Sequence, residues 1–292
     1  GTTGYTHVRF RDFHARAERM QGLALDSIHS KLADLNQSRA KLSANFHHNF
    51  VQASPSANDL FRWNAERQWN KADGGLVIQA AGTKEWTSSG LSFLRQIDGD
   101  FDIKIEFDPR QLAIPAAGQE SSIYLQAELT DPARTQVNST LVRMPSGTVV
   151  ANAKLRASLH SGEFQYRSLG AIELASVKQL RLARRGERIY WIAGSEAVSD
   201  ETIIASADIG DAAIDFGCLR MLVHTGGEGR SSEVLLRSLI VNAERLRDRS
   251  SADTAQQQRQ PALAAPPAVN QPNGKVPAQR PKSLFQSLFD IF

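Results

Sequence analysis

The stretch DFDIKIEFDP, residues 100–109, decides the fold class of this chain because its side chains alternate between apolar and charged at successive positions. A period of two is expected of a β-strand that buries one face and exposes the other. The stretch SSIYLQAEL, residues 121–129, repeats the pattern, so both predict half-buried strands. The apolar residues are Ile103, Ile105 and Phe107, then Ile123, Leu125, Ala127 and Leu129; the alternating polar residues are Asp102, Lys104 and Glu106, then Tyr124, Gln126 and Glu128.

Further strand-like stretches continue from about residue 58 to residue 246, at spacings of roughly ten residues. The segment KQLRLARRGERIYWIAG, residues 178–194, is typical of a β-hairpin. One of its adjacent Tyr190 and Trp191 has to face outward, so we expect that side chain to be exposed or covered by a loop. Because no helical segments separate the strands, we predict an all-β antiparallel sandwich. About 190 residues fit a jelly roll better than an immunoglobulin-type domain.

Composition narrows the classes of function. The chain has 292 residues, 41% of them apolar, and its net charge of +3 (34 basic minus 31 acidic residues) comes from interleaved signs, so we expect no nucleic-acid partner. The single cysteine, Cys218, excludes an internal disulfide. The sequence has no run of about eighteen apolar residues, so we expect no transmembrane segment. The histidines, including His47 and His48, lack carboxylates at metal-ligand spacing, so neither a metal site nor another cofactor is predicted.

Segments of different character flank the strand region. Residues 14–46 contain no proline and carry apolar residues at helical spacings, which predicts a helical connector before a sandwich over 47–249. Residues 250–282 are rich in Pro, Gln and Ala, which is typical of a disordered linker. Residues 283–292 suit an amphipathic peptide that docks in a groove of a protein partner, or on the surface of a shell or membrane. The alternative is that they fold back onto their own domain. The expected docking residues are Leu284, Phe285, Leu288, Phe289 and Phe292.

Two distant segments of the chain resemble each other. VRFRDFHARAERM, residues 8–20, and VLLRSLIVNAERL, residues 234–246, are identical at five of thirteen positions. The spacing between them would hold one jelly roll plus a helical connector. We therefore expect residues 1–13 to be the last strand of a preceding, similar domain in a tandem repeat. The alternative is a chance likeness of two amphipathic segments.

Three strand features carry a family resemblance: the strand Gly99 to Phe107, the hairpin Leu180 to Trp191 and the closing strand Val234 to Val241. Their succession resembles the jelly rolls of concanavalin A-like lectins and glucanases. In detail it resembles an uncharacterised domain family of large multidomain bacterial proteins. The resemblance implies a concanavalin-like β-sandwich.

The same resemblance implies where catalytic carboxylates would lie. Glucanases of this fold carry them at alternate positions of one strand. In this chain Asp102 and Glu106, or Glu128 on the next strand, are the residues available for such a role. Lys104 stands between Asp102 and Glu106, where that pattern needs another acid, and this departure argues against hydrolysis.

The resemblance also implies that a ligand lies across one sheet. Carbohydrate needs hydrogen-bonding groups together with an aromatic ring, because sugars present hydroxyls on their edges and C–H patches on their faces. If the two alternating strands face the same side, they supply that mixture. The expected ligand-binding residues are Asp102, Lys104, Glu106, Tyr124, Gln126 and Glu128.

These observations favour a non-catalytic recognition module. We expect it to bind carbohydrate or a protein partner within a larger envelope-associated or secreted bacterial protein. A glycoside-active jelly-roll enzyme is the first alternative, and a structural spacer domain is the second.

Overall fold

The computed structural model describes residues 27–63, 69–72, 74–82, 88–116, 120–158, 164–174, 176–195 and 200–248. The predicted remnant strand at 1–13, the linker at 250–282 and the docking peptide at 283–292 lie outside the described residues. Within these ranges no helix is both long and apolar enough to cross a membrane.

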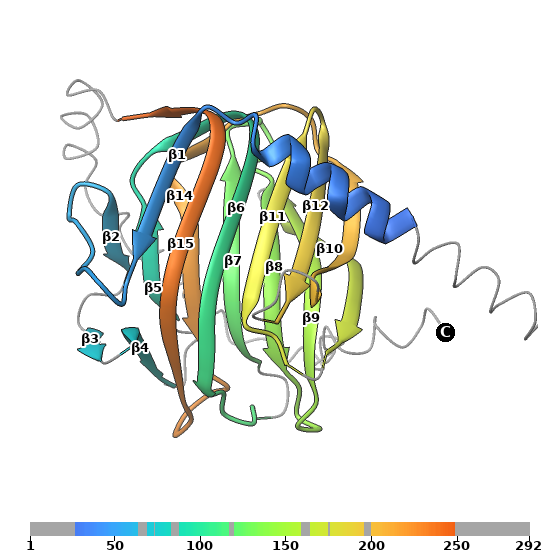
Figure 1. Ribbon diagram of the computed structural model, residues 1–292. Coiled ribbons are helices and arrows are strands. Elements are labelled where there is room, and N and C mark those ends of the chain that lie inside the picture. The colour runs from blue at the N-terminus through green and yellow to red at the C-terminus, as the bar shows by residue number, and fades with distance from the viewer. Residues whose placement is uncertain are drawn as a thin grey trace, which may run out of the picture.

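The described chain is dominated by antiparallel strands arranged in two layers (Figure 1). The strands are β1 (Ala44–Asn49), β2 (Leu60–Trp63), β3 (Trp69–Ala72), β4 (Gly75–Ala81), β5 (Ser88–Phe93), β6 (Gln96–Gln111), β7 (Ser121–Leu129), β8 (Gln136–Arg143), β9 (Val149–Ser158), β10 (Phe164–Glu173), β11 (Gln179–Arg185), β12 (Arg188–Gly194), β13 (Thr202–Asp208), β14 (Ile214–His224) and β15 (Ser231–Arg247).

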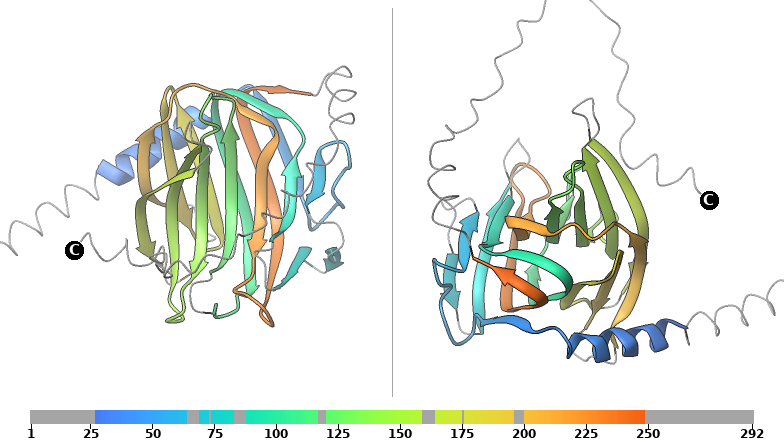
Figure 2. Two further views of the ribbon diagram at one scale, coloured as in Figure 1. Left: turned by 180° about the vertical axis from the view of Figure 1, so that it is seen from behind. Right: turned by 90° about the horizontal axis from the view of Figure 1, so that it is seen from above.

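The front sheet of Figure 1 is built around β6, which pairs with β15 on one side and β11 on the other. β15 also pairs with β1 and β4, and β4 pairs with β3. On the other side of β6, β11 pairs with β12, which pairs with β13. The back sheet has the order β2-β5-β14-β7-β8-β9-β10. A short pairing of β14 with β6 joins the two sheets, which curve around a common interior (Figure 2). The predicted jelly roll is therefore confirmed.

The core lies between the two sheets, and the apolar residues of the alternating stretch 100–109 are buried in it, as predicted. Ile103, Ile105 and Phe107 of β6 are fully buried, as are the apolar residues of β7. Trp191 of β12 also lies in this core, where its indole Nε1 donates to the backbone carbonyl of Asn138 at 3.1 Å. Each sheet therefore buries one face and turns the other outward.

A helix over residues 27–39 lies across the outer face of the front sheet, over β11 and β12 (Figures 1 and 2). Its Leu32 and Leu35 pack against Ala183, Tyr190 and Ile192, which form a second apolar cluster. Tyr190 is thus the outward-facing member of the Tyr190–Trp191 pair, and it is covered by this helix rather than by a loop.

The helix is followed at once by β1, which pairs with β15 from Ala44 onward. Residues 44–46, expected in the connector, are therefore part of the sheet. On the inward side of β1, the rings of Phe46, His48 and Phe50 follow one another, with His48 and Phe50 centroids 4.6 Å apart. Burial lowers the pKa of His48, although the carbonyl of Ala53 and the charge of Asp59 oppose this.

Replacing Leu35 with Ala should destabilise the fold by about 2–5 kcal/mol, because Leu35 is 1% exposed and its loss leaves a cavity above Tyr190. The free energy of unfolding in urea measures this effect. Gln37→Ala, on the exposed side of the same helix, is the matched control and should change stability by less than about 0.5 kcal/mol. A Leu35→Ala protein as stable as the control would show that the helix is not part of the folded unit.

Lowering the pH should destabilise the fold through His48. Its pKa in the folded protein lies below the ordinary value of 6.5, so between these two values the unfolded chain binds more protons. This contribution to stability is complete above pH 6.5 and is lost as the pH falls through that interval. Melting temperatures at pH 7.5 and 5.0 should differ less in His48→Gln than in the original protein. His47→Gln, at the exposed neighbouring position, should keep the original difference.

Candidate functional site

The structure divides the six predicted ligand-binding residues between the two sheets. Asp102, Lys104 and Glu106 lie on the outward side of β6 in the front sheet. Tyr124, Gln126 and Glu128 lie on the outward side of β7 in the back sheet. The two outer faces point away from each other, so the assumption of a shared face was wrong. Alternation along a strand shows which residues are outward but not to which sheet the strand belongs.

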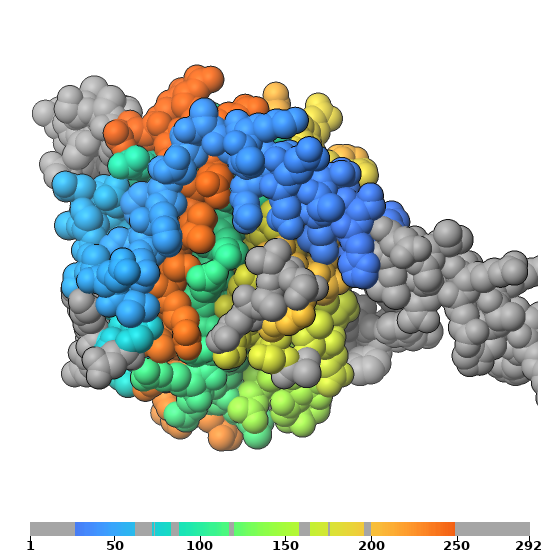
Figure 3. Space-filling view, in the orientation of Figure 1, coloured from blue at the N-terminus to red at the C-terminus, as the bar shows by residue number. Residues whose placement is uncertain are grey.

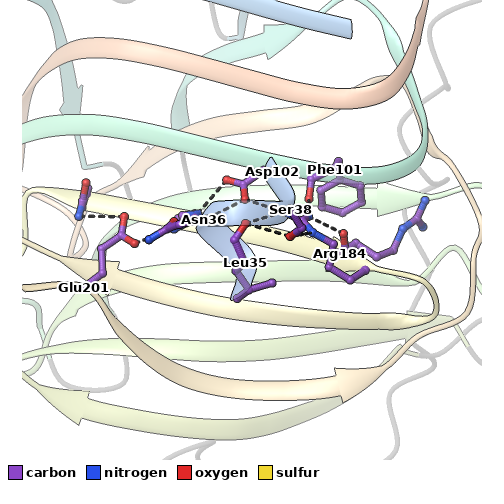
Figure 4. A network of polar contacts seen from close by, with 10 residues as sticks. Leu35, Asn36, Ser38, Phe101, Asp102, Arg184 and Glu201 are labelled. Atoms are coloured by element: carbon purple, nitrogen blue, oxygen red, sulfur yellow. Dashed lines mark hydrogen bonds and ion pairs between the residues drawn. The ribbon is translucent and has the colours of Figure 1, made fainter. Parts of the chain in front are cut away.

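Asp102 is held in a buried ion network that fully occupies its carboxylate (Figure 4). Arg181 donates to it twice, from Nε at 2.8 Å and from Nη2 at 2.7 Å. The Arg181 Nη1 donates to Glu201 at 2.6 Å and to the Asn36 side chain of the helix at 2.8 Å. Burial lowers the pKa of Arg181, but Asp102 and Glu201 outweigh it and raise the pKa overall. Arg181, held in place by Asp102, therefore links the helix to the front sheet.

The other two front-sheet residues neutralise each other. Lys104 Nζ lies 2.6 Å from Glu106, and Ser238 Oγ donates to the second carboxylate oxygen at 2.6 Å. Burial raises the pKa of Glu106, but Lys104 and Ser238 outweigh it and lower the pKa overall. Glu106 is therefore ionised at neutral pH and unsuited to act as a general acid.

The three carboxylates considered for hydrolysis do not form a catalytic pair. Asp102 is paired with arginine inside the front sheet, Glu106 is ionised beside Lys104, and Glu128 lies on the opposite sheet. Glycoside hydrolysis needs two carboxyl groups on either side of one sugar bond. Among these residues that arrangement is missing.

The outer face of the back sheet, here called the back face, brings together polar side chains from strands distant in sequence. Cross-strand pairing aligns them in rows that run across the sheet. The first row runs from β2 to β10 and consists of Phe61, Ser92, Arg220, Gln126, Asn138, Lys154 and Ser168. A second row has Leu222, Tyr124, Thr140 and Asn152, and a third has Glu128, Gln136, Arg156 and Tyr166.

Hydrogen bonds connect the third row across three strands. Gln136 donates to Glu128 at 2.8 Å, and Arg156 donates to the Gln136 carbonyl oxygen at 3.1 Å. Glu128 also forms an ion pair with Arg134. This series of hydrogen bonds and the ion pair orient the Gln136 amide and the Arg156 guanidinium on the back face.

A second cluster surrounds Tyr124 in the middle of the back face. The Tyr124 hydroxyl donates to Glu120, which forms an ion pair with Lys154 at 3.3 Å, and the His224 ring meets the Tyr124 ring edge-on at 4.6 Å. Burial and the neighbouring Glu120 carboxylate raise the pKa of Tyr124 well above its ordinary value. Burial raises the pKa of Glu120, but Lys154 and Tyr124 outweigh it and lower the pKa overall. At neutral pH Tyr124 is therefore a protonated hydrogen-bond donor and Glu120 an anion.

Several polar atoms of the back face are buried without a hydrogen-bond partner. They are Ser92 Oγ, Asn138 Oδ1 and Thr140 Oγ1, on residues 3%, 6% and 0% exposed. A buried polar atom without a partner costs about 1–3 kcal/mol, so such atoms are rare and call for an explanation. These three atoms are covered by neighbouring side chains, so the groups of the back face that a ligand can reach are the partly exposed Gln126 and Asn152 and the exposed Ser168.

Aromatic rings lie in the middle of the back face and at both of its edges. Tyr124 occupies the middle, Phe61 lies at the β2 edge and is 57% exposed, and Phe164 and Tyr166 lie at the β10 edge and are 49% and 57% exposed. The alternation of β7 predicted Tyr124, Gln126 and Glu128, whereas the residues of this face from β8, β9, β10 and β14 were not predicted. Their strands were recognisable, but nothing local shows that they are neighbours of β7.

The described residues contain no group of three or more potential metal ligands.

Fold and surface together define a jelly-roll domain with a polar, aromatic-flanked outer face. The model of one family, described as "Protein of unknown function (DUF1583) C domain", matches residues 1–65 and 64–265. The chain belongs to this family, which confirms the expected membership of an uncharacterised domain family. No curated protein matches the chain in sequence.

Several solved structures share the fold at low identity. The apo form of the Crh5 transglycosylase has a TM-score of 0.45 and 10% identity over 70% of this chain and 86% of that chain. The Bacillus licheniformis β-glucanase has a TM-score of 0.44 and 9% identity over 68% and 98%. The Emp47p carbohydrate recognition domain has a TM-score of 0.38 and 12% identity over 67% and 93%. Likenesses this distant say nothing of function, which has to be argued from the residues of this chain.

Removing the Asp102 carboxylate should destabilise the fold by about 3–5 kcal/mol, because Asp102→Ala leaves the buried Arg181 charge short of a partner. Glu106→Gln is the matched control on the same strand. Its side chain is 38% exposed, so we expect a change of less than about 1 kcal/mol. Unfolding in urea measures both. Equal, small losses would show that the Asp102 network does not support the fold.

Proposed function

We propose that this domain is a non-catalytic recognition module that binds carbohydrate across the back face. The observation that carries the proposal is the set of accessible polar side chains, Gln126, Asn152 and Ser168, on a face with exposed aromatic rings at its edges. Sugar hydroxyls would form hydrogen bonds with these side chains, and the C–H faces of sugar rings would rest on Tyr166 and Phe61.

The geometry also argues for binding without turnover. Glu120 is an anion paired with Lys154, and Glu128 is bonded to both Gln136 and Arg134. Neither is placed as a free general acid. Tyr124, with its raised pKa, does not serve as a base at neutral pH. These groups are suited to hold hydroxyls in place.

We further propose that the domain is one module of a larger repeat protein, with residues 1–13 as the end of a preceding similar domain. The separate match of the same family model to residues 1–65 supports this proposal. The peptide at 283–292, with Leu284, Phe285, Leu288, Phe289 and Phe292, remains a proposed docking element for a protein partner.

A glycan array probed with the full chain tests the proposal, with Tyr166→Ala as the variant. Tyr166 is 57% exposed, so its removal should leave the fold intact while weakening glycan binding by roughly five- to tenfold through the loss of stacking. Gln165→Ala, at the next position of β10 and also exposed, faces the other side of the sheet and should bind as the original protein does.

Three outcomes would contradict the proposal. Cleavage of a bound glycan would indicate the glycoside-active enzyme, and silence on the whole array would favour the structural spacer. Glycan binding that Tyr166→Ala leaves unchanged, but that a front-sheet change such as Lys104→Ala abolishes, would move the site to the other sheet.

A further inference from the structure

Arg156 is placed near the β10 edge of the back face among groups that orient its guanidinium. Its guanidinium carbon lies 3.4 Å from the ring centroid of Phe164 and 5.7 Å from that of Tyr166. Its Nη1 donates to the side-chain carbonyl of Gln136 at 3.1 Å. Stacking and this hydrogen bond hold the planar group beside the two exposed rings of β10.

Arg156 has no carboxylate partner among the described residues, in contrast to the basic side chains near it. Lys154 forms an ion pair with Glu120, and Arg134 forms ion pairs with Glu128 and Asp215. Glu128, in the same row as Arg156, is separated from it by Gln136. Among the described residues no carboxylate lies within ion-pair distance of Arg156, and Gln136 is the one acceptor that its Nη groups have there. A half-buried guanidinium thus keeps donor capacity for an anion.

We infer that the glycan bound on the back face is acidic, and that Arg156 binds the carboxylate or sulfate group of one of its sugars. A guanidinium presents paired N–H donors that match the two oxygens of such a group. The sugar that carries the anion would lie against Tyr166, next to the guanidinium. This inference rests on the proposed carbohydrate-binding function and names the class of glycan.

Titration calorimetry with three hexasaccharides tests the inference: an oligogalacturonate, its carboxyl-reduced neutral counterpart and a sulfated galactan fragment. The original protein should bind one of the two anionic sugars at least about tenfold more tightly than the neutral one, and added salt should reduce that preference. The anionic sugar that binds more tightly identifies the group, carboxylate or sulfate, that Arg156 recognises.

Variants of Arg156 separate its charge from its packing. Arg156→Gln should remove the preference for the anionic sugar and leave binding of the neutral sugar unchanged, and Arg156→Lys should restore the preference only in part because it lacks the paired donors. Arg167→Gln, on the oppositely directed side of β10, is the matched control and should behave as the original protein does.

The outcomes distinguish the inference from the proposed function. Equal binding of neutral and anionic sugars, weakened by Tyr166→Ala, would overturn the acidic specificity and keep the carbohydrate site. A preference that survives in Arg156→Gln would overturn the role of Arg156. Failure to bind any of the three sugars, together with silence on the glycan array, would overturn the proposed function itself.

Discussion

Burial of the Arg181 guanidinium is the constraint on which the front of the molecule depends. This side chain is 0% exposed, and an isolated charge in such a place costs several kcal/mol. The fold compensates it with Asp102 from β6, Glu201 ahead of β13 and Asn36 from the helix. Three segments distant in sequence therefore have to meet at one point, and the helix is fixed over the front sheet by polar bonds as well as by Leu35 (Figure 4).

Because the helix covers part of the front sheet, the two outer faces of the sandwich differ. Figure 3 shows the helix crossing the upper part of the front sheet. On that sheet, polar groups of β6 and β11 bond to one another. The back face carries partly exposed polar side chains, such as Gln126 and Asn152, that bond to no other side chain in the described part of the chain. Satisfied polar groups gain little from a ligand, and for this reason the proposed binding site is on the back sheet. Apolar and polar residues alternate in the same way along the strands of both sheets. The two outer faces therefore differ only in the groups that their outward side chains contact.

The limits of sequence reasoning are clear at particular residues. Local alternation predicted the buried sides of β6 and β7 correctly, because a strand with one face in a core requires it. It also predicted that Tyr190 or Trp191 would face outward, either exposed or under a loop. Tyr190 does face outward, but the helix over residues 27–39 covers it. The same reasoning treated Asp102 as a surface group, because its partner Arg181 lies 79 residues further along the chain. Charge alone does not reveal whether an outward residue is solvated or covered.

The sequence by itself determined the all-β character of this protein, the inward side of its strands and the apolar residues of its core, because these follow from the two-residue period of a strand. The tertiary structure alone decided which strands are neighbours. That choice separated Asp102, Lys104 and Glu106 from Tyr124, Gln126 and Glu128, and it placed Asn138, Lys154 and Arg156 beside the latter group. The reason is that pairing between distant strands depends on how the whole chain packs, whereas alternation is a property of each strand alone.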